Sequence, residues 1–176
     1  ITYTRRQFAA RIAGFAAAVH ADISGGEKLE TGYEGAEGDS IAEIESGLLD
    51  ALAQSRERDR RFSVTHVGPQ RDDISIRSDG MDLRAYGSQG QQRSAALSLK
   101  LAEMELMKSE GGEYPILLLD DVLSELDEKR QSKLIERIKA YQTIITCTHL
   151  TDDVREKIGE ITEFRVRAGT VERSDK

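Results

Sequence analysis

The sequence has 176 residues, of which 38% are hydrophobic, and a formal net charge of −7. This length suits one to one and a half domains, and the acidic balance does not favour a chain that grips DNA over its whole surface. One cysteine, Cys147, excludes an internal disulfide and fits a reducing cytoplasm, and we interpret it as a small buried strand residue. No apolar run approaches membrane-spanning length, and no targeting signal precedes the first expected helix. Because residue 1 is not a Met, we expect the chain to be a piece of a longer one.

The first predicted element is an amphipathic helix over about residues 4–20. Its apolar stripe recurs at helical spacing and consists of Phe8, Ile12, Phe15 and Val19. A strand is predicted next, because Leu29, Thr31 and Tyr33 alternate with charged residues. Residues 24–28 lie between the two and are interpreted as a turn. The sequence assigns no function to His20 and His66.

A second helix is predicted after an acidic loop at residues 34–39. Ser40 with Glu43 forms a capping-box pattern, and the helix that it starts is lined by Ile41, Ile44, Leu48 and Leu52. We expect this helix to run to about Arg60, through a charged stretch that contains Arg56, Arg58, Arg60 and Arg61. The stretch has two interpretations, a solvated helix end with ion pairs at helical spacing or a patch that faces DNA. Residues 1–62 are expected to form a small α+β lever arm of two helices and a strand element.

A hairpin is predicted where the chain continues from residue 62, because Asp79-Gly80 is a good two-residue turn. The sequence Tyr-Gly-Ser-Gln-Gly-Gln-Gln-Arg at residues 86–93 then opens a long helix with two apolar stripes, which Gly111-Gly112 would end. A Gly- and Ser-rich turn at a helix start presents free backbone N–H groups and the positive end of the helix dipole. The candidate anion ligands in this turn are Ser88, Gln89, Gly90 and Gln91.

The four apolar residues 116–119 predict a strand that is buried on both faces of a parallel sheet. Asp120 and Asp121 follow at once, at the position where ligands bind in open α/β sheets. Adjacent residues of an extended chain point to opposite sides, so one carboxylate can hold a metal while the other faces a water. This arrangement suits phosphoryl transfer with Mg²⁺. The alternative is that Asp121 or Asp127 merely caps the helix that follows.

The remaining chain alternates helix and strand, as in a doubly wound α/β sheet. A helix after Asp127 is lined by Leu134, Ile135 and Ile138. Residues 143–147 predict another buried strand with Thr148 and His149 at its carboxyl end, a further helix begins at Thr151, and a terminal hairpin turns at Ala168-Gly169. A lone histidine is usually structural or a surface residue, but at this edge His149 could reach a phosphate or an attacking water.

Together these motifs resemble the ABC-type ATPase heads of the SMC-like group, and within it the branch that serves bacterial recombination repair. Residues 87–91 resemble the signature motif of the group, 116–121 its Walker B strand, 124–127 its D-loop, and His149 its switch histidine. Residues 67–73 also resemble a segment of this branch, with Gln70 where a His is usual. The resemblance implies a partial ABC-ATPase head, a C-terminal lobe over residues 63–176 preceded by the lever arm.

The resemblance also implies a mechanism that needs ATP and two molecules. Asp120 would bind Mg²⁺, Asp121 would orient the hydrolytic water, and Asp127 would lie at the dimer seam. The turn at residues 88–91 would contact a nucleotide held by the partner molecule. The homodimer would clamp gapped DNA and, with two further proteins of the pathway, help to load a recombinase.

The sequence contains no Gly-Lys dipeptide and therefore no phosphate loop of the Walker A type. We expect that half to lie upstream, so that this chain alone is inactive as an ATPase. Two other functions stay open: a nucleotide-independent module that binds DNA or a protein, and the head of another SMC- or ABC-type ATPase. Asp121-Val122 departs from the Glu-Pro of transporter motors, and the short arm departs from the long coiled coil of a Rad50-like head.

Overall fold

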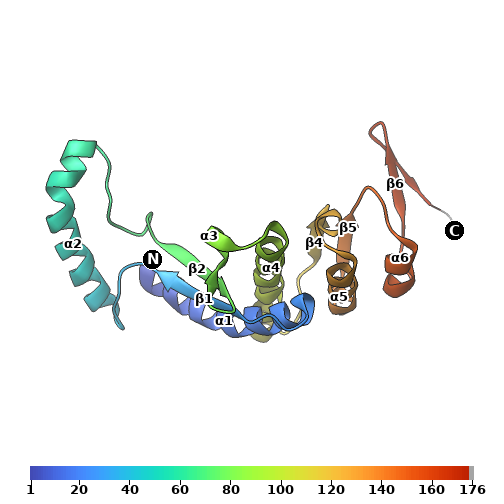
Figure 1. The fold of residues 1–176 in the computed structure, drawn as a ribbon, viewed down its shortest axis with the longest axis horizontal. Helices are drawn as coiled ribbons and strands as arrows, with labels where there is room; N and C mark the ends of the chain where they lie inside the picture. The colour runs from blue at the N-terminus through green and yellow to red at the C-terminus, as the bar shows by residue number, and fades with distance from the viewer. Residues whose placement is uncertain (175–176) are drawn as a thin grey trace. The chain divides into compact units, whose positions relative to one another are not determined.

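The first helix of the computed structural model, α1 (Thr2–Ser24), confirms the first predicted helix and extends it at both ends (Figure 1). Its buried face differs from the predicted stripe, because Ala9 and Ala16 are buried whereas Phe8 is 42% exposed. α1 packs against α4 (Gln89–Gly111), and the small alanine side chains let the two helices approach closely. The stripe is therefore rotated toward the alanines. The structure describes residues 1–174.

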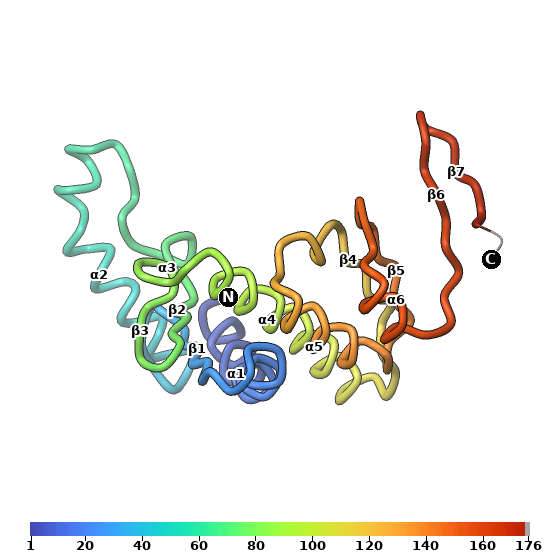
Figure 2. Tube along the Cα trace, turned by 45° about the vertical axis from the view of Figure 1, so that its right-hand side comes forward, coloured from blue at the N-terminus to red at the C-terminus, as the bar shows by residue number. Residues whose placement is uncertain are grey.

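An antiparallel sheet follows in the order β1 (Leu29–Glu34), β2 (Asp73–Ser78) and β3 (Met81–Asp82). The β2–β3 turn is Asp79-Gly80, as predicted, and both residues have positive φ, 48° and 80°, which suits a tight hairpin. Figure 2 shows β1 running beside α1. One core joins the sheet, α1 and α4, and its buried members are Ile12, Ala16, Leu29, Leu83, Ala95 and Ala102.

Helix α2 (Ile41–Phe62) begins at the predicted cap, where Ser40 Oγ accepts from the Glu43 N–H at 3.2 Å. The Glu43 carboxylate accepts from the backbone N–H of Asp39 at 2.9 Å, so the predicted capping box is displaced by one residue. Among the predicted lining residues only Ile44 is buried, and Ile41 is 66% exposed. Most of the predicted stripe is therefore open to solvent, because the described residues place no second apolar layer along this face.

His66 connects the segment that follows α2 to the last turns of that helix through hydrogen bonds to Asp59. Its Nδ1 lies 2.7 Å from Asp59 Oδ1, and its backbone N–H donates to the same oxygen at 3.1 Å. The hydrogen bond from His66 holds the pKa of Asp59 below its usual value. His66 thus has a structural role in the turn after α2.

Asp72, in the segment 67–73, ties the start of α1 to β1. Its carboxylate accepts from Thr2 Oγ1 at 3.0 Å and from the hydroxyl of Tyr33. Burial raises the pKa of Tyr33, and the hydrogen bond to Asp72 raises it further.

Residues 116 onward form a second compact unit, distinct from Ile1–Pro115. β4 (Leu117–Asp120) and β5 (Thr143–Thr146) pair in parallel, and α5 (Glu128–Ile138) connects them. α6 (Asp152–Ile158) and the hairpin of β6 (Phe164–Arg167) and β7 (Thr170–Arg173) follow, as predicted. The predicted α/β class is confirmed. The division into arm and lobe at residue 62 stays a prediction.

The prediction that β4 and β5 are buried on both faces is wrong. Leu117 and Leu119 are buried, but Leu118 is 70% exposed, Ile116 56% and Ile144 58%. Alternate residues of a strand point to opposite faces, and within the described part of this unit only one face is covered. None of the helices in residues 1–174 combines the length and the apolar character needed to cross a membrane.

Candidate functional site

The candidate anion turn, residues 88–91, starts helix α4 and is held by a reciprocal capping box. Ser88 Oγ accepts from the backbone N–H of Gln91 at 3.3 Å, and Gln91 Oε1 accepts from the backbone N–H of Ser88 at 3.0 Å. Ser88 and Gln89 are exposed, whereas Gly90 and Gln91 are partly buried. We call residues 88–91 the signature turn.

The segment before the signature turn is tightly folded. The short helix α3 (Leu83–Tyr86) is capped by Asp82, and the next residue is Gly87. A Cβ at Gly87 would lie 2.5 Å from the Leu83 carbonyl oxygen, closer than non-bonded atoms approach. Gln92 Nε2 donates to the carbonyls of Leu83, at 2.8 Å, and Gly87, at 3.2 Å. This packing places the N-terminus of α4 at the surface, where its dipole favours an anion.

Asp120 ends strand β4 opposite Thr146 of β5. The Thr146 hydroxyl donates to an Asp120 carboxylate oxygen and accepts from the backbone N–H of Asp121 at 3.1 Å. The Asp121 N–H also lies 3.1 Å from the Thr146 carbonyl oxygen. Thr146 therefore fixes both predicted carboxylate residues at the carboxyl ends of two parallel strands.

Asp121 leaves the strand with a left-handed backbone, φ 51° and ψ 21°. Aspartate is among the few residues that adopt this conformation readily. The change of direction starts the 3₁₀ turn η1 (Val122–Glu125), in which Ser124 Oγ donates to the Asp121 carbonyl at 2.8 Å. Asp120 and Asp121 are both exposed, so their carboxylates are open to a ligand.

Asp127 caps helix α5, in agreement with the alternative left open by the sequence. Its carboxylate accepts from the backbone N–H of Arg130 at 3.0 Å, and this hydrogen bond holds its pKa below the usual value. The Asp127 side chain remains 54% exposed. The position of Asp127 at a dimer seam stays a prediction.

His149 follows β5 by three residues and is exposed. Cys147, directly after β5, is also exposed, so its predicted burial is wrong; the strand ends one residue earlier than expected. Partial desolvation raises the pKa of the Cys147 thiol, and the charge of Asp121 raises it further. A thiol of this kind is a weak nucleophile.

The residues present fit a magnesium ion only together with further oxygen ligands. Within residues 1–174 no three His, Cys, Asp or Glu side chains cluster closely enough to hold a metal. Mg²⁺ usually takes one or two carboxylates and completes its shell with substrate phosphates and water. Asp120, a hard oxygen ligand fixed by Thr146, suits that mode.

The four candidate DNA-binding arginines, Arg56, Arg58, Arg60 and Arg61, lie on the last turns of α2 and are all exposed. Arg56 and Arg60 are one helical turn apart and share a face, whereas Arg58 and Arg61 share another. Arg60 pairs with Glu57 at 3.5 Å, and the Arg61 guanidinium lies 5.6 Å from the Phe62 ring centre. The patch is accessible, but its arginines point to more than one side.

The sequence does not single out two residues, one that holds Asp120 and one that is buried where α1 packs against α4. Thr146 belongs to the predicted strand 143–147, and a hydroxyl residue in register with Asp120 on a neighbouring strand is the signal that points to its role. His20 was left unassigned, and it is fully buried between α1 and α4. A sequence pattern does not show the packing of two helices that are far apart in the chain.

A parallel strand pair with adjacent aspartates at the end of one strand, and a capped turn that opens a long helix, are features of the fold of SMC-like ABC-type ATPase heads, of which this chain forms part. A solved SMC ATPase described by "ATP-driven dimerization and DNA stimulated activation" shares this fold with a TM-score of 0.57 at 16% identity, over 99% of this chain and 88% of that one. No protein-family model matches the chain.

More similar proteins narrow the class. The DNA replication and repair protein RecF of Lachnoclostridium phytofermentans is 52% identical over 157 residues, 89% of this chain and 42% of that protein. RecF of Geobacillus thermodenitrificans is 44% identical over 97% of this chain and 48% of its own length. A solved structure of the "recombination mediator protein RecF-ATP in RecFOR pathway" has a TM-score of 0.77 at 35% identity, over 98% of this chain and 46% of that one. The chain belongs to the RecF family and spans about half the length of the curated relatives it matches.

Proposed function

We propose that this chain is the signature and Walker B portion of an ATP-gated DNA-repair switch, which closes as a homodimer on gapped DNA. The observation that carries the proposal is the pair Asp120 and Asp121, fixed by Thr146 at the ends of two parallel strands in a RecF-like fold. Neighbours described as RecF-ATP and as SMC ATPases with ATP-driven dimerisation support the use of ATP. RecO and RecR are the expected partners in loading the recombinase, and the cytoplasm is the expected location.

In this proposal each carboxylate has a separate task. Asp120 is a ligand of Mg²⁺, which neutralises phosphate charge when it is bound. Asp121 and His149 orient the attacking water near the γ-phosphate, and Asp127 lies at the seam of the dimer. The exposed N-terminus of α4 receives the phosphates of a nucleotide bound by a second copy.

In the structure the Gln91 N–H already donates a hydrogen bond to Ser88 Oγ. A phosphate at the signature turn would therefore take over this N–H from the serine or use the N–H groups beside it. In both cases the positive end of the α4 dipole stabilises the phosphates of a nucleotide that the other molecule holds. ATP bound in this way links the two heads. This chain alone carries no phosphate loop and is proposed to be inactive by itself.

The test is light scattering of a full-length protein that joins this chain to its phosphate-loop half. Wild type should dimerise with ATP, Ser88→Arg should weaken dimerisation by about tenfold or more, a loss of about 1.4 kcal/mol, and Asp121→Asn should accumulate the dimer because hydrolysis stops. Ser109→Arg is the matched control, since Ser109 is an exposed serine near the other end of α4.

Absence of ATP-dependent dimerisation in wild type would refute the proposal. Equal behaviour of Ser88→Arg and Ser109→Arg would remove the signature turn from the mechanism. If Asp121→Asn hydrolyses ATP at the wild-type rate, Asp121 does not orient the water.

A second candidate function, nucleotide-independent DNA binding, is favoured by the exposed arginines of α2. Filter binding of this chain to gapped DNA tests it, with Arg58→Glu and Arg60→Glu together against Arg77→Glu, an exposed arginine of β2. Binding that falls only in the α2 variant supports the assignment. Unchanged binding removes these arginines from the interface.

A further inference from the structure

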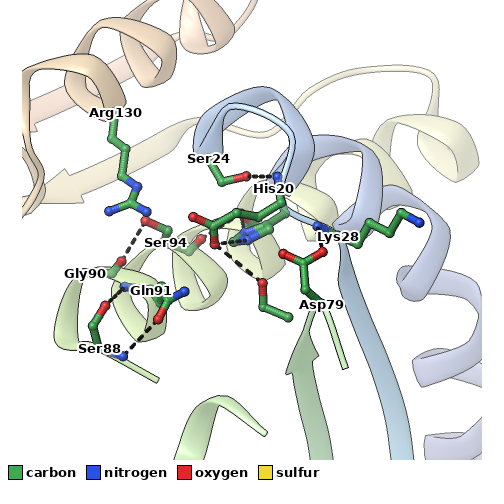
Figure 3. Close-up of polar contacts among 12 residues, drawn as sticks. His20, Ser24, Lys28, Asp79, Ser88, Gly90, Gln91, Ser94 and Arg130 are labelled. Atoms are coloured by element: carbon green, nitrogen blue, oxygen red, sulfur yellow. Dashed lines mark hydrogen bonds and ion pairs between the residues drawn. The ribbon is translucent and has the colours of Figure 1, made fainter. Parts of the chain in front are cut away.

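A buried polar chain leads from His20 in α1 to the signature turn at the start of α4 (Figure 3). His20, Ser94 and Ser98 have no exposed surface. His20 Nδ1 lies 3.1 Å from Ser98 Oγ, Ser98 Oγ donates to the Ser94 carbonyl at 2.7 Å, and Ser94 Oγ donates to the Gly90 carbonyl at 2.8 Å. Three buried polar side chains therefore end on a residue of the signature turn.

The hydrogen-bond roles along this chain follow from the number of protons available. A serine hydroxyl has a single hydrogen, and that of Ser98 is given to the Ser94 carbonyl. Ser98 Oγ can then only accept from His20, which means that Nδ1 of His20 carries a hydrogen. The other ring nitrogen, Nε2, faces the Glu27 carboxylate at 3.8 Å.

The far end of the chain is anchored in the β-sheet. Glu27 Oε2 accepts from Ser78 Oγ at 3.4 Å, and the neighbouring backbone N–H of Lys28 donates to Asp79 at 3.3 Å. Ser78 is buried at the end of β2. His20 therefore joins the β2–β3 turn, α1 and α4 at one point.

A buried polar group is costly unless its hydrogen bonds are made, and a fully satisfied network selects one arrangement of the elements around it. The other buried side chains of α1 and α4 are mainly apolar, and because apolar contacts are not directional they oppose a slide of one helix against the other less specifically than hydrogen bonds do. The directional bonds of His20 and Ser98 resist such a slide. They determine where α4 begins relative to the sheet.

We propose that His20 is a positioning residue for the signature turn: it acts through Ser98 and Ser94 on the first turn of α4 and so sets the geometry in which that turn meets nucleotide. The inference rests on the proposed role of the signature turn. The inference adds His20 to the residues that determine how the signature turn works, although His20 lies far from that turn in the sequence and is buried away from any ligand.

Three substitutions separate positioning from packing. The amide of His20→Asn can place a donor where Nδ1 lies, that of His20→Gln where Nε2 lies, and His20→Leu provides neither. Hydrogen exchange of the bonded amides of residues 91–94, measured without nucleotide, should become about tenfold faster in the Leu and Gln variants and stay near wild type in the Asn variant, because only the Asn variant keeps the donor to Ser98.

ATP-dependent dimerisation of the full-length protein should follow the same order, with Ser88→Arg measured beside it. If wild type fails to dimerise, the proposed function fails while the exchange pattern still decides the role of His20. If wild type dimerises but the Asn variant is as impaired as the Leu variant, or if all three match wild type, the positioning role is wrong.

Two further measurements keep the inference decidable if a His20 variant does not fold. Ser98→Ala removes the acceptor and should reproduce the faster exchange, whereas Ser109→Ala, a serine of α4 that bonds only the Leu106 carbonyl at 2.7 Å, should not. The ¹⁵N shifts of the wild-type His20 ring should show a hydrogen on Nδ1. A ring protonated only on Nε2 would overturn the proposal.

Discussion

At the scale of single residues, the contacts of Thr146 predict that its substitution weakens Mg²⁺ binding at Asp120. Its hydroxyl donates to the Asp120 carboxylate and accepts from the Asp121 N–H, so Thr146→Val should leave the strand intact and release the Asp120 carboxylate, whereas the Asp121 N–H keeps its bond to the carbonyl of residue 146. Groups that orient a metal ligand typically contribute a factor of about 10 to 100 in metal affinity or activity. We expect the Mg²⁺ concentration for half-maximal ATP turnover by the full-length protein to rise by about tenfold.

Thr143→Val is the control for this prediction. Thr143 begins the same strand, and its hydroxyl donates only to the Tyr141 carbonyl at 3.3 Å. Identical Mg²⁺ dependence of the two variants would show that the Thr146 hydroxyl does not orient Asp120.

At the scale of elements, the turn from α3 into α4 depends on a glycine for space. Gly87 has an ordinary φ of −67°, so its requirement is close approach to the Leu83 carbonyl and not backbone freedom. Gly87→Ala should lower the free energy of unfolding by about 1–3 kcal/mol, since overpacking forces the backbone to move. Urea unfolding of the chain measures this change.

Gly111→Ala provides the comparison at the other end of α4. A Cβ there meets no atom within 4 Å, and alanine is the better helix former, so stability should stay equal or rise by up to about 1 kcal/mol. If the free energy of unfolding falls equally in both variants, the contact with the Leu83 carbonyl is not the reason that Gly87→Ala is destabilised.

At the scale of the whole molecule, the exposed apolar face of β4 and β5 is expected to pack against another part of the protein. Leu118 is 70% exposed and Ile144 58%, and adjacent apolar side chains of this size are usually an interface. The curated relatives are about twice as long as this chain, so we expect their remaining half to supply the cover. Co-expressed as two polypeptides, the halves should copurify, and Leu118→Lys should abolish copurification.

Gln142→Lys adds the same charge at an exposed polar position immediately before β5 and should leave copurification unchanged. If Leu118→Lys copurifies as well as Gln142→Lys does, another surface joins the halves. Light scattering of this chain alone then shows whether a second copy covers the face instead.

The elements themselves followed from local chemistry. Ser40, Asp127 and Thr151 cap the helices that their side chains predicted, and Asp79-Gly80 forms the predicted hairpin, because caps and tight turns depend on a few adjacent residues. The adjacent aspartates Asp120 and Asp121, at the end of β4, could be recognised in the sequence for the same reason. The resemblance of these motifs to a known group then indicated the RecF family.

Tertiary structure alone decided which faces are covered and which distant groups meet. The buried face of α1 runs through Ala16, which shares a core with Ala95 and Ala102 of α4, and one face of β4 is open because Leu118 stays exposed among the residues that the structure describes. Thr146 meets Asp120, and His20 meets Ser98, across 26 and 78 residues of sequence. Side-chain periodicity and capping act over one or two turns of chain, whereas these contacts depend on how whole elements pack.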